Sequence, residues 1–153
     1  TTAHTHRVAA ALMETGIAVA GVNKALFRTK SRTRLAMEAW MAEWAEYYDN
    51  DRVVIMQIPR SLCLDYKATE ADVEELSSLA ALVAGTDCGV TLRELEPGKV
   101  KISLRTGPRV NATKVCALLG GGGHAAAAGA TLSATLSEAK QAVLQAIDMV
   151  VGE

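Results

Sequence analysis

Four consecutive glycines, Gly120–Gly123, constrain the fold of this chain more than any other feature of its sequence. A glycine run loses more backbone entropy on folding than an ordinary turn requires. A backbone without Cβ atoms can approach another group closely, and its N–H groups can form a concave surface that binds anions. We expect the alanine-rich segment Ala125–Ala128 to begin a short helix whose positive end faces the same anion. The run therefore predicts a phosphate-binding loop, with His124 beside it as a donor.

Hydrophobic periodicity predicts an α/β (α+β) fold, in which a mixed β-sheet has flanking helices and a helical connector precedes it. Strands are expected where apolar residues run together or alternate with polar ones, over 53–58, 88–95, 99–105 and 130–134. Helices are expected over 5–14, 19–28, 31–47, 69–83 and 111–119, and from Ser137 toward the C-terminus. The polar break Asp49–Asp51 divides the chain into a connector, 1–50, and a globular domain, 51–153.

The charge and the aromatic content restrict the possible partners. A formal net charge of −1 gives no global attraction to nucleic acid, so long-duplex binding is disfavoured and any polyanion must meet a local patch. Aromatic residues make up only 4% of the chain, whereas single-strand binders usually stack bases on several rings. We interpret the four aromatic residues near the end of the connector as helix-packing residues: Trp40, Trp44, Tyr47 and Tyr48.

The sequence carries no sign of a membrane or an oxidising compartment. No apolar stretch approaches the roughly 20 residues that span a bilayer, and the N-terminus lacks a signal-peptide pattern. Three cysteines, Cys63, Cys88 and Cys116, have no CxxC spacing, which favours reduced, packed thiols over disulfides or zinc ligands. A cytoplasmic protein without membrane contact is expected.

Two polar residues near the glycine run have a structural and a functional interpretation. A lone histidine among small apolar residues is more often structural than catalytic, but an imidazole that follows three glycines can donate to a phosphate oxygen. We therefore predict that His124 contacts substrate. Asn111 either caps the helix that it precedes or reads a nucleobase edge.

The sequence around the glycine run resembles a known family. Gly121-Gly122-Gly123-His124 and Ala127-Ala128-Gly129, preceded by a strand that ends Ser103-Leu104-Arg105 and a short helix from Asn111, resemble the C-terminal DHH-associated domain, first type, of the DHH phosphoesterases. Within that superfamily the chain is most similar to bacterial enzymes that degrade very short RNAs, dephosphorylate phosphoadenosine phosphate or cleave cyclic dinucleotides. Residues 5–17 also resemble the end of the family's catalytic domain.

The resemblance implies a division of labour. Those enzymes bind two manganese ions on Asp and His residues that include an Asp-His-His triplet, and the triplet is absent from these 153 residues. No catalytic residue, metal ligand or cofactor is therefore expected in this chain, and manganese is expected in a catalytic DHH domain outside it. The residues expected to bind substrate are Arg105, Asn111, Gly120, Gly121, Gly122, Gly123 and His124.

The resulting hypothesis is a substrate-binding half of a manganese-dependent phosphoesterase that acts on short oligonucleotides or nucleotide phosphates. Its expected partners are that substrate, the catalytic DHH domain and, as an open alternative, a second copy of the chain. A stand-alone nucleotide- or RNA-binding module, of the kind attached to alanyl-tRNA synthetase-like proteins, is the alternative function. An inert packing domain is the third possibility.

Overall fold

The computed structural model describes residues 1–152, and the chain divides into two compact units, Thr1–Ser31 and Arg32–Glu153. The first unit consists of helix α1 (Ala3–Glu14), helix α2 (Val19–Asn23) and the π-helical turn η1 (Lys24–Arg28). Thr2 caps α1, because its hydroxyl accepts the N–H of Thr5 at 3.3 Å. The helices predicted over 5–14 and 19–28 are confirmed.

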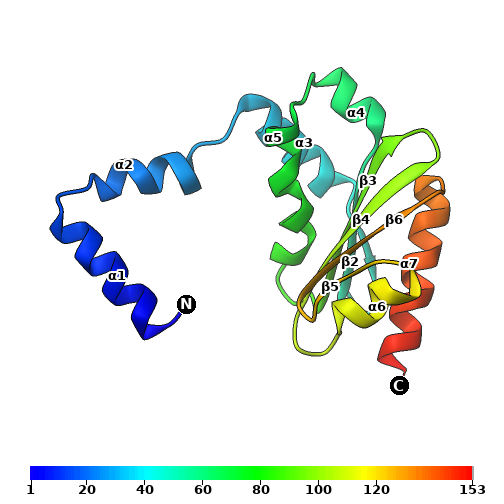
Figure 1. Cartoon of the computed structure of the whole chain (residues 1–153). Helices are drawn as coiled ribbons and strands as arrows, with labels where there is room; N and C mark the ends of the chain where they lie inside the picture. Colours follow the sequence, from blue (N-terminus) through cyan, green and yellow to red (C-terminus); the bar gives the residue numbers. More distant parts are fainter. Residues whose placement is uncertain (153) are drawn as a thin grey trace. The chain divides into compact units, whose positions relative to one another are not determined.

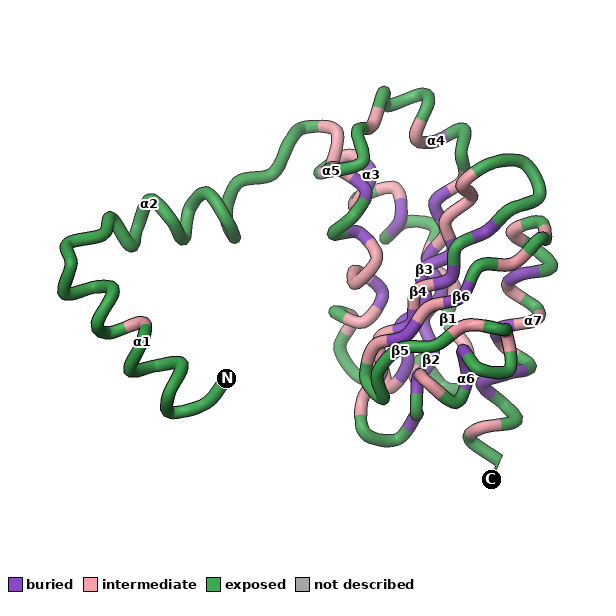
Figure 2. The backbone as a smooth tube through the Cα atoms, in the orientation of Figure 1, coloured by how far each residue is buried: buried purple, intermediate pink, exposed green. Residues whose placement is uncertain are grey.

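The first unit has no core of its own. None of its residues is buried, and Figure 2 shows it exposed along nearly its whole length. Local hydrogen bonds and caps therefore hold these helices, since apolar burial within the unit contributes little. The large apolar side chains left exposed in it are Val8, Leu12, Met13, Ile17, Val19, Val22, Leu26 and Phe27.

In the second unit, the described residues form a mixed six-stranded sheet with the strand order β1-β2-β3-β4-β6-β5 (Figure 1). Neighbouring strands are antiparallel except β2 and β3, which are parallel. The predicted mixed sheet with flanking helices is confirmed. The strands are β1 (Glu46–Tyr48), β2 (Val53–Ile58), β3 (Cys88–Glu96), β4 (Lys99–Thr106), β5 (Gly122–His124) and β6 (Ala127–Leu132).

Helices α6 (Ala112–Leu118) and α7 (Leu136–Val151) cover one face of the sheet, on the right in Figure 1. The alternate residues Val100, Ile102 and Leu104 of β4 point to this face and are fully buried. They join a core that extends from β2 to β6. Cys88 belongs to it as a free thiol, and burial raises its pKa to about 12.

The opposite face is covered over only part of its width. Its helices are α3 (Arg32–Glu43), α4 (Arg60–Asp65), α5 (Glu70–Glu74) and the 3₁₀ helix η2 (Glu75–Leu82). They bury Val54, Met56 and Ile58 of β2, and η2 lies so close to β3 that a Cβ at Gly89 would collide with the backbone of Ala81. Helix η2 also reaches the neighbouring strand β4, and the rest of this face, over β6 and β5, stays open among the described residues.

The end of the predicted connector helix is wrong. The helix expected over 31–47 ends at Glu43, and Glu46–Tyr48 instead forms β1, which pairs with β2. A strand forms because Glu46 accepts hydrogen bonds from Tyr48 (2.6 Å), Gln57 (2.7 Å) and Lys140 of α7 (2.8 Å). These contacts and the ladder to β2 outweigh local helix propensity.

Helix α3 nevertheless packs as its pattern indicates. Met37 and Met41 are fully buried against β2, and the rings of Trp40 and Trp44 stack with centroids 6.1 Å apart. Because α3 and β1 pack against the sheet, they belong to the unit that begins at Arg32.

Three other elements differ from expectation. Thr135, not Ser137, caps the last helix, through a capping box with Glu138. The strand expected over 130–134 spans Ala127–Leu132, and a short helix that the sequence did not predict, α4, follows β2. No helix among residues 1–152 is both long and apolar enough to cross a lipid bilayer.

Candidate functional site

The glycine run begins as the end of helix α6. Gly120 has φ +72°, the left-handed conformation that commonly follows a helix. The N–H of Gly120 donates to the carbonyl of Ala117 at 3.1 Å, and the N–H of Gly121 donates to that of Cys116 at 2.7 Å. This pair of hydrogen bonds is a Schellman motif, so Gly120 has a structural reason to be glycine.

Gly121 and Gly123 are required by the close pairing of β5 with β6. A Cβ at Gly121 would lie 2.7 Å from the Cβ of Ala130, and one at Gly123 would lie 2.6 Å from the carbonyl oxygen of Ala127. Gly123 also has φ +150°. The backbone entropy that these two glycines lose on folding therefore has a structural reason, which the sequence alone did not reveal.

Gly122 is different. A Cβ on it would meet no atom within 4 Å, and its φ is not positive. Neither packing nor backbone geometry within the described chain therefore requires glycine at this position. A side chain at position 122 would occupy the space above the sheet, where a ligand would lie.

The predicted helix after His124 is wrong, because Ala125 and Ala126 form the turn of a β5–β6 hairpin. This turn is anchored to its surroundings, since the carbonyl of Ala125 accepts the N–H of Ala112 at 2.8 Å and the hydroxyl of Thr106 at 3.1 Å. Hydrogen bonds at both ends hold the glycine segment in place. A rigid segment of this kind loses little entropy when it binds a ligand.

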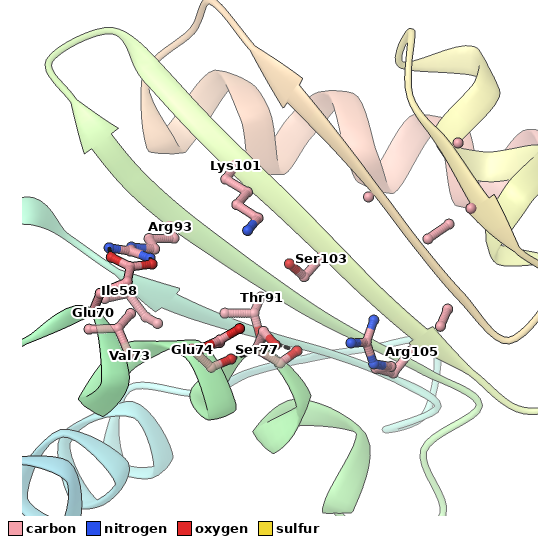
Figure 3. A pocket seen from close by; sticks show the side chains of 15 residues that line it. Ile58, Glu70, Val73, Glu74, Ser77, Thr91, Arg93, Lys101, Ser103 and Arg105 are labelled. Carbon is pink, nitrogen blue, oxygen red and sulfur yellow. Dashed lines mark hydrogen bonds and ion pairs between the residues drawn. The ribbon is translucent and has the colours of Figure 1, made fainter.

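The uncovered part of the sheet forms a hollow of about 450 Å³, which we call the sheet groove (Figure 3). Strands β3, β4, β5 and β6 form its floor, and α5 and η2 form one wall. Its residues are Ile58, Glu70, Val73, Glu74, Ser77, Thr91, Arg93, Lys101, Ser103, Arg105, Gly122, Gly123, Ala127, Ala128 and Gly129.

The strand register brings the glycine segment beside the polar row of β4. Ser103 lies opposite Gly129, which lies opposite Gly122. One level along, Arg105 lies opposite Ala127, which lies opposite His124. Two inter-strand spacings, about 10 Å, thus separate the backbone of β4 from that of β5 at both levels. The strip between them carries only Gly129 and Ala127, so it is flat and open.

Charges are distributed unevenly along the sheet groove. Arg93 donates two hydrogen bonds to Glu70, each 2.7 Å long, and this contact lowers the pKa of the Glu70 carboxyl. Arg105 is half-buried, and its guanidinium donates to the carbonyl of Leu104 at 3.1 Å. No carboxylate among the described residues pairs with Arg105. It therefore retains donors for an anionic ligand.

The other predicted site residues lie around the sheet groove or beyond it. Gly120 and Gly121 border a shallow depression next to it, and His124 is exposed at the level of Arg105 but does not line the hollow. Asn111 caps α6, since its side chain accepts the N–H of Lys114 at 3.2 Å. Asn111 also lines a separate depression formed with Thr106, Gly107, Pro108, Val110, Ala125 and Ala126.

Sequence reasoning missed Lys101, Arg93 and the α5–η2 wall. Lys101 could have been predicted from strand alternation. It precedes Ser103 by two residues, so it lies on the same face of the strand as Ser103 and Arg105. The wall has no sequence signal that connects it to β4, because α5 reaches the sheet groove only through tertiary packing. Arg109, which is close to Arg105 in the sequence, pairs with Asp87 at 3.4 Å and does not line the sheet groove.

The residues that the structure describes offer no metal site. Among residues 1–152, no three His, Cys, Asp or Glu side chains are grouped so that they could hold a metal ion. Two-metal phosphoester hydrolysis needs several such ligands a few ångströms apart. The side chains that line the sheet groove can offer a ligand hydrogen bonds and positive charge.

Comparisons with known proteins agree with this arrangement. The chain is 34% identical over 149 residues to the bifunctional oligoribonuclease and PAP phosphatase NrnA of Thermus thermophilus, and this match covers 96% of the chain and 44% of the relative. An exopolyphosphatase-related protein from Bacteroides fragilis superposes with a TM-score of 0.88 at 20% identity, over 99% of this chain and 45% of that one.

A pGpG-specific phosphodiesterase from Vibrio cholerae superposes more loosely, with a TM-score of 0.55 at 13% identity, over 79% of this chain and 40% of that one. The chain thus spans less than half the length of each of these proteins. A family model, that of the DHHA1 domain, matches residues 50–153. Since this match covers more than half of the chain, the chain belongs to the DHHA1 domain family of the DHH phosphoesterases.

Proposed function

We propose that this chain is the substrate-binding part of a DHH-family phosphoesterase that acts on short oligonucleotides or nucleotide phosphates. The observation that carries the proposal is Arg105, which lies in the sheet groove without a carboxylate partner and at the level of the glycine hairpin. A guanidinium binds a phosphate through two parallel hydrogen bonds, which suits it better than an ammonium for this task.

Each part of the site has a role in the proposal. Arg105 binds a phosphate of the substrate, and Ser103 donates a hydroxyl hydrogen bond beside it. Gly122 lets the substrate approach the backbone, and β5 is an edge strand whose outer N–H groups pair with no other strand of the described residues. His124 lies at the rim, where it donates to a phosphate oxygen of a longer substrate.

The hydrolytic step belongs to another domain in this proposal. A catalytic DHH domain would hold manganese ions, which would activate water and stabilise the developing charge, and the chain described here would present the substrate to that domain. Support comes from the relatives, which are more than twice as long as this chain. The match to the Thermus enzyme also spans nearly the whole chain, including most of Thr1–Ser31, which favours a phosphoesterase over a stand-alone RNA-binding module.

The test measures the binding of a dinucleotide to the 153-residue chain by NMR titration and calorimetry. Arg105→Ala should weaken binding by about 10- to 100-fold, because a charge-assisted hydrogen bond contributes about 1.5–3 kcal/mol. Arg109→Ala is the matched control, since Arg109 is an exposed arginine that pairs with Asp87 outside the sheet groove. Unchanged affinity in Arg105→Ala, or shifts that map away from the sheet groove, would refute the assignment.

A further inference from the structure

The β5–β6 hairpin carries Gly122 and His124, two residues of the proposed site, but side-chain packing does little to hold it. Residues 122–126 are all exposed. Strand β5 pairs with β6 over three residues and has no other strand beside it among the described residues. A segment with few buried apolar contacts opens readily unless hydrogen bonds hold it. The position of His124 therefore depends on the hydrogen bonds of the turn that follows it.

Thr106 is the residue of β4 that ties this turn to the sheet. Its N–H donates to the carbonyl of Ala126 at 3.0 Å, and its hydroxyl donates to the carbonyl of Ala125 at 3.1 Å. Thr106 directly follows Arg105 in the chain, and Ala125 directly follows His124. The hydroxyl contact thus joins the immediate neighbours of the two polar side chains of the proposed site.

Thr106 is itself a fixed point. It pairs with Cys88 in the β3–β4 ladder, and the N–H of Gly107, the next residue, donates to the carbonyl of Asp87 at 2.8 Å. Strand alternation turns the Thr106 side chain away from the face that carries Arg105, and this side chain does not line the sheet groove. It can therefore influence a ligand in the sheet groove only through the hairpin.

The hydroxyl contact can be removed without removing the rest of the anchor. The carbonyl of Ala125 also accepts the N–H of Ala112 at 2.8 Å, and the bond from Thr106 N–H to Ala126 does not depend on the side chain. Valine has nearly the shape of threonine but lacks the donor, whereas serine keeps the donor. The hairpin should still form in Thr106→Val, with its turn less tightly held.

We propose that Thr106 is a positioning residue, whose hydroxyl holds the hairpin turn so that His124 stays at a fixed separation from Arg105. One ligand can then contact both side chains without first ordering the turn, and that ordering would cost affinity. This inference rests on the proposed function, because it requires Arg105 and His124 to bind the same substrate. Thr106 contributes to binding without touching the ligand.

The test measures binding of the trinucleotide ApApA to the 153-residue chain by calorimetry, because His124 is assigned to a longer substrate. Thr106→Val should weaken binding by about three- to tenfold, the effect of one neutral hydrogen bond, and Thr106→Ser should bind as the wild type does. His124→Ala should also weaken binding, and adding Thr106→Val to it should cause no further loss. A merely structural role of Thr106 would not produce this coupling. An amide HSQC spectrum and a thermal melt check that each variant folds.

Thr33→Val is the matched control, because the Thr33 hydroxyl also donates to a distant backbone carbonyl, that of Tyr66 at 3.4 Å, but lies in α3 outside the sheet groove. It should bind ApApA as the wild type does. Unchanged affinity in Thr106→Val, no recovery in Thr106→Ser, or an equal loss with and without His124 would refute the positioning role while Arg105→Ala still weakens binding. If the wild type does not bind ApApA, or Arg105→Ala binds it equally well, the proposed function fails and this inference with it.

Discussion

Replacing Gly122 by alanine tests the functional interpretation of the glycine run, because stability and binding should change in different directions. The new Cβ would meet no atom within 4 Å, and φ at this position is not positive. Under these conditions alanine stabilises a protein by about 0.4–1 kcal/mol, since it reduces the entropy of the unfolded chain. For a chain of this size the melting temperature should rise by about 2–4 °C at most.

Gly121→Ala is the contrasting variant. Its Cβ would lie 2.7 Å from the Cβ of Ala130 and collide with the carbonyl of Gly129, so β5 must shift away from β6. Overpacking of this kind costs about 1–3 kcal/mol. The melting temperature should therefore fall in Gly121→Ala and should stay constant or rise in Gly122→Ala.

Ligand affinity is the second property that we expect to change in Gly122→Ala. In Gly122→Ala the added methyl group occupies the surface on which a phosphate would approach the backbone, so affinity for a dinucleotide should fall by about tenfold or more. Thermal melts and titrations on the same preparation measure both effects. A Gly122→Ala chain with unchanged affinity would refute the role of Gly122, and one destabilised as much as Gly121→Ala would contradict the geometry of β5.

Two further predictions concern chemistry and pH. The purified 153-residue chain should show no manganese-stimulated hydrolysis of a dinucleotide; turnover that is lost on mutating a residue of this chain would contradict the assignment of the metals to another domain. At Glu46, partial burial alone would raise the carboxyl pKa, but hydrogen bonds from Lys140, Tyr48 and Gln57 together lower it. Its stabilising contribution is thus full above the ordinary value of 4.5 and is lost as the pH falls through the lower, folded-state pKa. Glu46→Gln should cost about 1 kcal/mol at pH 7 and less at pH 3, measured by urea unfolding; an equal cost at both values would exclude this linkage.

The glycine run shows how far the sequence predicts the site. Its position and its relation to α6 were predictable, because Asn111 is a typical cap and a glycine commonly ends a helix. The separate reasons for the four glycines were not predictable. They depend on how closely β5 approaches β6, and the hairpin itself was hidden by alanines, which have a high helix propensity. Tertiary pairing, not local preference, decides between helix and strand there.

The end of α3 is likewise determined by tertiary pairing and not by local preference. Residues 44–48 carry aromatic and charged side chains that suit a helix pattern as well as a strand. The strand forms because Glu46 reaches Lys140, 94 residues away in the chain. Such a distant contact leaves no signal in the local sequence, whereas the β3–β4 hairpin, which depends on neighbouring residues, was predicted within one or two residues.

The location of the sheet groove follows from a contrast between two strands that is visible in the sequence. Strand β2 is apolar on both faces and needs helices on both, whereas β4 alternates, with Val100, Ile102 and Leu104 toward one face and Lys101, Ser103 and Arg105 toward the other. Covering the polar face of β4 with a helix would bury cations without partners, at a cost of several kcal/mol for each. The helical layer therefore ends at η2, which only reaches the margin of β4, and the open floor beside it carries the cations Arg105 and Lys101.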